Sequence, residues 1–154
     1  METIKQTVAQ NFGGDNSHKL VGEEQQFSLE DTPDLSGKVA VITGGSQGIG
    51  YGCSHTLLTH NIAKLFILSG SEDVADKAID AIKQELGEEA SQKVTWLQID
   101  LADWHSVPKV AAEISKNTDR LDILINNAAR GIMTYQKTNY GVDRHVRCPC
   151  MTDF

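Results

Sequence analysis

Short apolar runs alternate along the chain with longer segments in which apolar residues recur at helical spacing. Four runs rich in Val, Ile and Leu suit strands that are buried on both faces of a sheet. The first three occupy residues 39–43, 63–70 and 94–100, and the fourth strand and the turn after it occupy 121–129. The intervening segments predict helices at 49–61, 72–86 and around 107–114, the last two with apolar side chains on one face. Gly87 is expected to close the second helix.

The predicted elements follow one another as strand, helix, strand, helix, strand, helix, strand. Connections of this kind run right-handed between parallel strands and place helices on both faces of the sheet. The expected fold is therefore α/β, with a doubly wound parallel sheet in three layers.

Residues 1–36 are polar, contain Gly13 and Gly14, and show no sustained period. We interpret them as a flexible N-terminal arm. The alternative is a short capping helix at Thr3–Gln10. The core is then expected to come from residues 37 to about 144.

Charge and composition narrow the partners of this 154-residue chain. The net charge of −7, with no cluster of Lys and Arg, argues against nucleic acid and against anionic membrane surfaces. No apolar run approaches the 18 residues of a membrane-spanning helix. The N-terminus lacks the features of a signal or transit peptide, and three cysteines make no disulfide framework. We therefore expect a cytoplasmic protein.

The sequence TGGSQGIG at 43–50 follows a predicted strand and opens a predicted helix. Gly44, Gly48 and Gly50 would let the backbone turn tightly and approach a pyrophosphate, and the helix N-terminus would offer free N–H groups to the anion. A P-loop is excluded because Tyr51 stands where its lysine is needed, and G-x-G-x-x-G fails at Cys53. The alternative is a glycine-rich turn without a ligand.

Two further polar features follow predicted strands: Asp100, and the sequence NNAA at 126–129. Carboxyl ends of parallel strands meet at one edge of the sheet, where α/β proteins bind ligands. Each feature is weak alone, because Asp caps helices and Asn-Asn is common in turns. Together with the glycine motif they predict a polar site at that edge.

These three motifs resemble the N-terminal half of the short-chain dehydrogenase/reductase family. The resemblance begins near Leu35, in LSGKVAVITGG, and ends near His145, with Ala129 in place of the family's glycine. It implies a partial NAD(P)-binding Rossmann domain over 37–145, with about four strands in the order 3-2-1-4. The residues implied to bind the cofactor are Gly44, Ser46, Gln47, Gly48, Ile49, Gly50, Ser69, Asp100, Leu101, Asn127 and Ala128.

The resemblance also implies a role for each residue. The glycine motif would line the pyrophosphate and nicotinamide side, with Gly50 allowing close packing of helix on strand. Asp100 would bond the adenine amino group with Leu101 beside the ring, and Asn127 and Ala128 would face the nicotinamide ribose. Asn126 would tie neighbouring strands together.

The choice between NAD and NADP is left undecided by the sequence. In the family an acid after the second strand selects NAD, and a basic residue there or just before Gly48 selects NADP. This chain has Ser69, Gly70 and Ser71 at the first place and Gln47 at the second. The serines suit a 2′-phosphate, whereas the acidic residues at 72 and 73 would repel one.

The family's catalytic residues are not found in the sequence. Family members oxidise alcohols or reduce carbonyls of small molecules by hydride transfer, using Ser and a Y-x-x-x-K motif. Here Tyr51, Tyr135 and Tyr140 are followed four residues later by His, Asn and Arg. We expect the chain to bind dinucleotide without catalysing the reaction. The alternative function is a non-catalytic dinucleotide-binding or interaction module that pairs with a longer homologue.

Residues 146–154 resemble nothing in the family, and we interpret them as the result of a shifted frame, a retained intron or an early stop. A metal site at His145, Cys148 and Cys150 is the alternative, but three ligands with Pro149 between the cysteines fit no common geometry, so no metal is expected. Such a truncated sheet would expose the strand at 123–125, which predicts self-association through that edge.

Overall fold

The computed structural model describes residues 28–129, 137 and 141. The chain divides into two compact units, residues 1–32 and 33–154. In the first unit the described part is a 3₁₀ turn, η2 (Leu29–Asp31). Its Ser28 hydroxyl accepts from the Glu30 N–H, and the Asp31 carboxylate accepts from the Ser28 N–H. The helix considered at Thr3–Gln10 and the tail at 146–154 lie outside the described residues.

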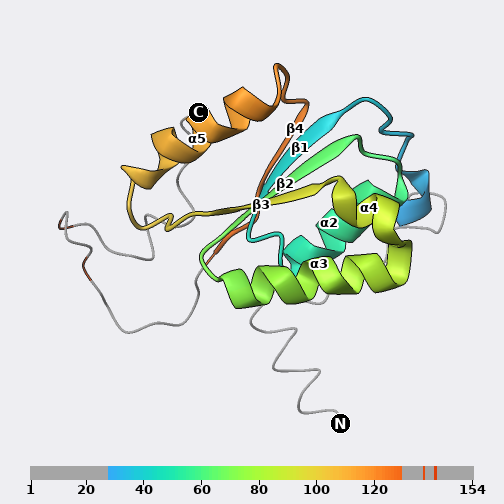
Figure 1. Ribbon diagram of the computed structural model, residues 1–154, viewed down its shortest axis with the longest axis horizontal. Helices are drawn as coiled ribbons and strands as arrows, with labels where there is room; N and C mark the ends of the chain where they lie inside the picture. The colour runs from blue at the N-terminus through green and yellow to red at the C-terminus, as the bar shows by residue number, and fades with distance from the viewer. Residues whose placement is uncertain (1–27, 130–136, 138–140, 142–154) are drawn as a thin grey trace, which may run out of the picture. The chain divides into compact units, whose positions relative to one another are not determined.

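The second unit is built on a parallel sheet of four strands (Figure 1). The strands are β1 (Val39–Thr43), β2 (Lys64–Ser69), β3 (Val94–Gln98) and β4 (Ile123–Asn126). They lie side by side in the order β3-β2-β1-β4. Every neighbouring pair is parallel. The expected fold class and strand order are therefore confirmed.

Helices cover both faces of this sheet (Figure 1). On one side lie α2 (Gly48–Thr59), α3 (Glu72–Leu86) and the short α4 (Glu88–Gln92). On the other lies α5 (Ser106–Asn117). Helix α4 was not predicted, because its five residues are too few to show a period. Gly87, with a φ of +91°, ends α3 and immediately opens α4.

The side chains of the central strands fill a core on each side of the sheet. Ile42 and Ile67 lie in one cluster with Ile82 of α3, whereas Phe66 and Val107 lie in the cluster on the α5 side. All five positions of β1 are buried, as the continuous apolar run predicts. Leu35 is also buried in the first cluster, so packing begins two residues before the expected start at 37.

Strand β4 is an outer strand of the described sheet and is less buried than β1. Its entry is fixed by Asp122, whose carboxylate accepts from the Val39 N–H at 2.9 Å and from the Arg120 guanidinium. The pKa of the Asp122 carboxyl is lowered, first by the hydrogen bond from Arg120 and then by that from Val39. Charge at Asp122 therefore favours the join between β1 and β4.

Candidate functional site

The loop between β1 and α2 is a tight glycine turn. Gly44 and Gly48 have φ values of +68° and +56°, a region that L side chains rarely adopt. Gly45 has no such φ, but a Cβ there would overlap the Ile42 side chain. The hydroxyl of Ser54, fully buried in α2, donates to the Gly45 carbonyl at 3.0 Å. The turn is therefore held against the first helix.

Gly50 lies where α2 passes closest to this turn. A Cβ at Gly50 would overlap the carbonyl group of Gly44 and the side-chain amide of Asn127. Gly50 therefore permits the first turn of α2 to touch both the glycine turn and the segment after β4. This agrees with the close packing expected of Gly50, although its nearest neighbours are a turn and an amide group, not a strand.

Thr43 and Asn127 join the ends of β1 and β4. The Thr43 hydroxyl accepts from the N–H groups of Asn127 and Ala128 at 3.1 and 3.0 Å. The Asn127 side-chain amide donates to the carbonyl oxygens of Thr43 and Gly44 at 3.1 and 3.2 Å. The structural role expected of Asn126 is thus carried by Asn127. Asn126 pairs with Thr43 in the strand register and is exposed.

A hollow of about 930 Å³ opens at the carboxyl ends of the four strands. Its lining comprises residues 44, 46–50, 68–71, 74, 99–102 and 127–129. It therefore brings together every cofactor-binding residue predicted from the sequence: Gly44, Ser46, Gln47, Gly48, Ile49, Gly50, Ser69, Asp100, Leu101, Asn127 and Ala128. Whether these residues bind a cofactor stays a prediction.

Sequence reasoning missed several apolar residues of the lining. Leu68 is the penultimate residue of β2, Ile99 directly follows β3, Val74 lies in the first turn of α3, and Ala102 lies two residues after Asp100. Their position next to the strand ends was the available signal. Ser54 was also missed, and nothing in the sequence distinguishes it from other helical serines. With the apolar residues and the predicted polar ones, the hollow has both apolar walls and polar groups, the usual composition of a small-molecule site.

The first turn of α2 supplies the strongest anion-binding feature of the hollow. The opening N–H groups of a helix have no partner within the helix and carry a partial positive charge. Residues 48–50 open α2 and line the hollow, and Gly48 has open space where a Cβ would be. A phosphate group can therefore approach the backbone closely at this point.

Polar groups from the other strands complete the rim. Asp100 is exposed after β3, and its carboxylate accepts from the Ala102 N–H at 2.9 Å. After β2, the Ser69 hydroxyl accepts from the Trp96 indole N–H at 2.9 Å. The Gly70 carbonyl accepts from the Gln98 side-chain amide at 3.3 Å. The rim thus offers hydroxyl and carboxylate groups fixed by their own hydrogen bonds.

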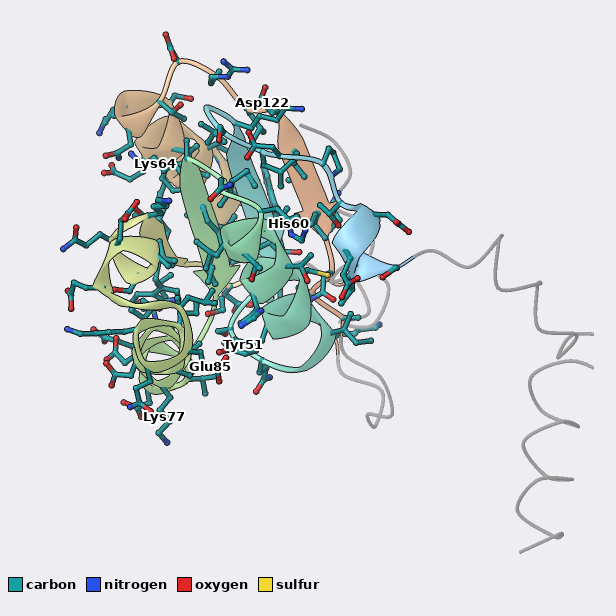
Figure 2. The ribbon with its side chains drawn as sticks, turned by 90° about the vertical axis from the view of Figure 1, so that its right-hand side faces the viewer. Tyr51, His60, Lys64, Lys77, Glu85 and Asp122 are labelled. Atoms are coloured by element: carbon teal, nitrogen blue, oxygen red, sulfur yellow. The ribbon has the colours of Figure 1, made fainter. Side chains whose placement is uncertain are left out.

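Tyr51 lies outside this hollow, where α2 meets α3 (Figure 2). Its hydroxyl donates to the Glu85 carboxylate at 3.4 Å, and His55 lies 3.2 Å from the same carboxylate. Burial, and then the charge of Glu85, raise the pKa of Tyr51, which is the wrong direction for a general base. Tyr135 and Tyr140 lie outside the described residues.

Within residues 28–129, 137 and 141, the structure groups no His, Cys, Asp and Glu side chains as metal ligands. The rival metal site at His145, Cys148 and Cys150 falls outside this range. In the same described part, no helix combines the length and apolar character needed to cross a membrane.

The chain matches the family model for short chain dehydrogenases over residues 38–144. It therefore belongs to the short-chain dehydrogenase/reductase family of oxidoreductases. The matched range begins just before β1 and contains the whole sheet, its helices and the hollow.

Individual oxidoreductases of known sequence or structure are also similar to this chain. The chain is 54% identical over 146 residues to a protein of Neurospora crassa named as the mitochondrial oxidoreductase bli-4, covering 95% of this chain and 35% of that protein. Menthone neomenthol reductase from Mentha piperita is 33% identical, with a TM-score of 0.56, over 60% of this chain and 32% of the reductase. The C-domain, with NADP, of a bacterial malonyl-CoA reductase is 31% identical, with a TM-score of 0.57, over 68% of this chain and 16% of that chain.

The matches differ in how much of each protein they cover, and the longest one includes most of the N-terminal segment. The chain spans about a third of the length of the curated relatives that it matches. The match to bli-4 omits at most 8 of the 154 residues, so residues 9–36 have a counterpart in that protein. The segment interpreted as an arm thus lies within a region of shared sequence.

Proposed function

We propose that this chain is the nicotinamide-dinucleotide-binding part of an oxidoreductase that interconverts alcohols and carbonyls. The single observation that supports the ligand is the hollow of about 930 Å³ at the carboxyl edge, which joins the N-terminus of α2 to polar groups after β2, β3 and β4. The NADP in the structure of the malonyl-CoA reductase domain supports the same class of ligand.

The residues of the hollow fit the parts of such a molecule. The pyrophosphate would lie against the N–H groups at the start of α2, where Gly48 leaves space. The adenosine half would extend past Ser69 towards Asp100, and the nicotinamide half towards Asn127 and Ala128. When bound, the nicotinamide supplies a donor or acceptor of hydride. The chain's own residues bind and orient it.

We propose that these 154 residues bind the dinucleotide without turnover, because none of the three tyrosines has a lysine four positions later. In the family that lysine lowers the pKa of the tyrosine for proton transfer. The small-molecule alcohol or carbonyl substrate belongs to the family as a whole, and this chain is expected to contribute the cofactor part of the site.

Titration of the chain with NAD⁺ and NADP⁺, followed by tryptophan fluorescence and calorimetry, tests this function. The variant Gln47→Glu adds a negative charge at the exposed residue before α2 and should weaken binding about tenfold through repulsion of the pyrophosphate. The matched control Gln84→Glu makes the same change at an exposed position of α3 outside the hollow and should leave binding unchanged. Equal affinities of the two variants for the dinucleotide would contradict the proposed site.

The compartment is also a proposal. We propose the cytoplasm, whereas the name of the Neurospora relative places that protein in the mitochondrion. Fractionation of cells that express the chain with a C-terminal tag distinguishes the two. We expect the tagged chain in the cytoplasmic fraction, and its recovery with mitochondria would overturn that expectation.

A second copy of this chain is also a proposed partner. Strand β4 is outermost in the described sheet, and Leu121 and Leu124 near it are 49% and 37% exposed. An outer strand with apolar side chains can pair with the same strand of a second copy. We therefore propose that copies of the chain associate through β4.

A further inference from the structure

Ser54 is a fully buried polar residue that does not belong to the lining of the hollow. It lies in α2, and its hydroxyl donates to the Gly45 carbonyl at 3.0 Å. Burial of a hydroxyl is costly unless the group makes a hydrogen bond, so this contact is needed to keep Ser54 in the core. The acceptor lies in the glycine turn, and Ser54 therefore connects the body of α2 to the loop that precedes it.

The direction of this hydrogen bond is unusual for a hydroxyl within a helix. Thr56 and Thr59 of the same helix, and Ser115 of α5, each donate to the carbonyl four residues earlier. That carbonyl is a common acceptor for Ser and Thr in the middle of a helix. Ser54 instead donates to a residue nine positions earlier, outside its own helix. The bond therefore fixes the turn and not the helix.

Gly45 is a position at which the backbone needs such an anchor. Glycine has a wider range of backbone angles than any other residue, so a peptide group beside it is easily reoriented. A residue with a narrower range does not fit, because a Cβ at position 45 would come too close to the Ile42 side chain and to the Ser54 hydroxyl. The turn thus requires glycine at this point, and the hydrogen bond from Ser54 supplies the restraint that glycine lacks.

The same restraint acts on the next N–H group along the chain. The Gly45 carbonyl and the Ser46 N–H belong to one peptide group, and none of the described peptide bonds is cis. The two groups of a trans peptide point in opposite directions, so the Ser46 N–H is directed away from Ser54. Ser46 is buried and lines the hollow, and its N–H has no acceptor among the described residues. A buried N–H without an acceptor is unfavourable, so this group is suited to a ligand.

We propose, on the basis of the function proposed above, that Ser54 is a positioning residue for the bound dinucleotide. By holding the Gly45 carbonyl, Ser54 orients the Ser46 N–H towards the hollow. This N–H donates to an oxygen of the pyrophosphate, beside the N–H groups that open α2. The orientation exists before the ligand arrives, so little conformational entropy is lost on binding.

Calorimetric titration of the full chain with NAD⁺, NADP⁺ and ADP tests this role. Ser54→Ala should weaken binding of each nucleotide about threefold to tenfold, the usual net value of one hydrogen bond, because all three contain two linked phosphates. The matched control Ser91→Ala removes the hydroxyl of another buried serine, which donates to the Glu88 carbonyl at 2.8 Å outside the hollow. Ser91→Ala should lower stability without changing any of these affinities. Equal nucleotide affinities of the two variants would overturn the positioning role.

The amide resonance of Ser46 provides a measurement that a loss of stability alone does not change. In the ¹H–¹⁵N NMR spectrum of the wild-type chain, saturating nucleotide should move the Ser46 amide proton to lower field, as a new hydrogen bond does. The shift should be smaller in Ser54→Ala. If Ser54→Ala does not fold, the wild-type spectrum decides alone. An unchanged Ser46 resonance, while those of residues 48–50 respond to the nucleotide, would overturn the inference.

Failure of this inference is distinguishable from failure of the proposed function. A wild-type chain that binds nucleotide as tightly as Ser54→Ala does would refute the positioning role and leave the function in place. A wild-type chain that unfolds cooperatively in urea but binds none of the three nucleotides would refute the proposed function, and this inference with it.

Discussion

The side-chain amide of Asn127 lies 3.2 Å from the carbonyl oxygen of Gly44, although the two residues are 83 positions apart in the chain. The same amide also reaches the Thr43 carbonyl, so both hydrogens are used to hold the glycine turn. The turn after β1 and the segment after β4 are therefore one connected structure. Its geometry decides where the N-terminus of α2 points, and with it the anion-binding end of the hollow.

Replacing Asn127 with Ala should lower both stability and dinucleotide affinity. The variant leaves two part-buried carbonyls without their donor, which costs about 1 to 3 kcal/mol in the free energy of unfolding. Urea denaturation followed by tryptophan fluorescence measures this loss, and NAD⁺ titration measures the affinity.

The neighbouring Asn126 provides a matched control for this prediction. It is exposed, so Asn126→Ala should change the free energy of unfolding by less than about 0.5 kcal/mol. If the two alanine variants lost equal stability, Asn127 would not be the residue that fixes the turn.

Gly50 should tolerate no side chain. In Gly50→Ala the new Cβ meets backbone atoms of Gly44, which cannot rotate away, so we expect a loss of about 3 kcal/mol or failure to fold. The control is Gly52→Ala in the same helix, where nothing lies within 4 Å of the new Cβ. That change should raise stability by about 0.5 to 1 kcal/mol, because alanine is the better helix former. Thermal unfolding of both variants measures the contrast, and a stable Gly50→Ala chain would refute the tight approach.

The fold was predictable because its signals are local. The helix expected at 72–86 has the observed bounds, since its apolar stripe and the glycine at 87 are both visible in the sequence. The strand expected at 63–70 is observed at Lys64–Ser69. Its inner residues are all buried and therefore all apolar, so they form a continuous apolar run that is visible in the sequence. Helix α4 escaped prediction because one short turn has no period to detect.

The site was predictable in its members but not in its contacts. Motifs at the carboxyl ends of strands converge once the sheet is parallel, which is why Gly44, Asp100 and Ala128 line one hollow. The structural contacts expected of Asn126 are made by Asn127, because alternation along β4 stops where the Asn127 N–H turns back to the Ile125 carbonyl. The contact of Trp96 with Ser69 depends on strand register, which a single sequence does not specify.

Acid should weaken the join between β1 and β4 through Asp122. The pKa of this carboxyl is lowered in the folded chain, first by Arg120 and then by the Val39 N–H, so its contribution is present above the unfolded value near 3.9. The contribution is lost as the pH falls through the lowered folded value. Asp122→Asn should therefore be less stable than the wild-type chain at pH 7 and should approach it as the pH falls below about 4. Urea denaturation at a series of pH values measures the difference.

Asp119 is the control for the acid prediction, because it is an exposed carboxylate on the same loop. Asp119→Asn should lose little stability relative to the wild-type chain at pH 7. A difference between wild-type and Asp122→Asn chains that stayed constant from pH 7 to pH 3 would show that the charge of Asp122 does not support the join.

A charge on the outer strand should prevent association of the chain. Leu124 is 37% exposed on β4, and it lines a hollow of about 420 Å³ together with other apolar residues that include Val41, Ile114 and Leu121. Leu124→Lys places an ammonium group on each copy, and two copies brought together through β4 would then repel each other. Sedimentation velocity should show concentration-dependent association of the wild-type chain and a smaller species for the variant.

The control Ala112→Lys adds the same charge at an exposed position of α5 and should associate as the wild-type chain does. A monomeric wild-type chain, or equal association of Leu124→Lys, would exclude β4 as the contact.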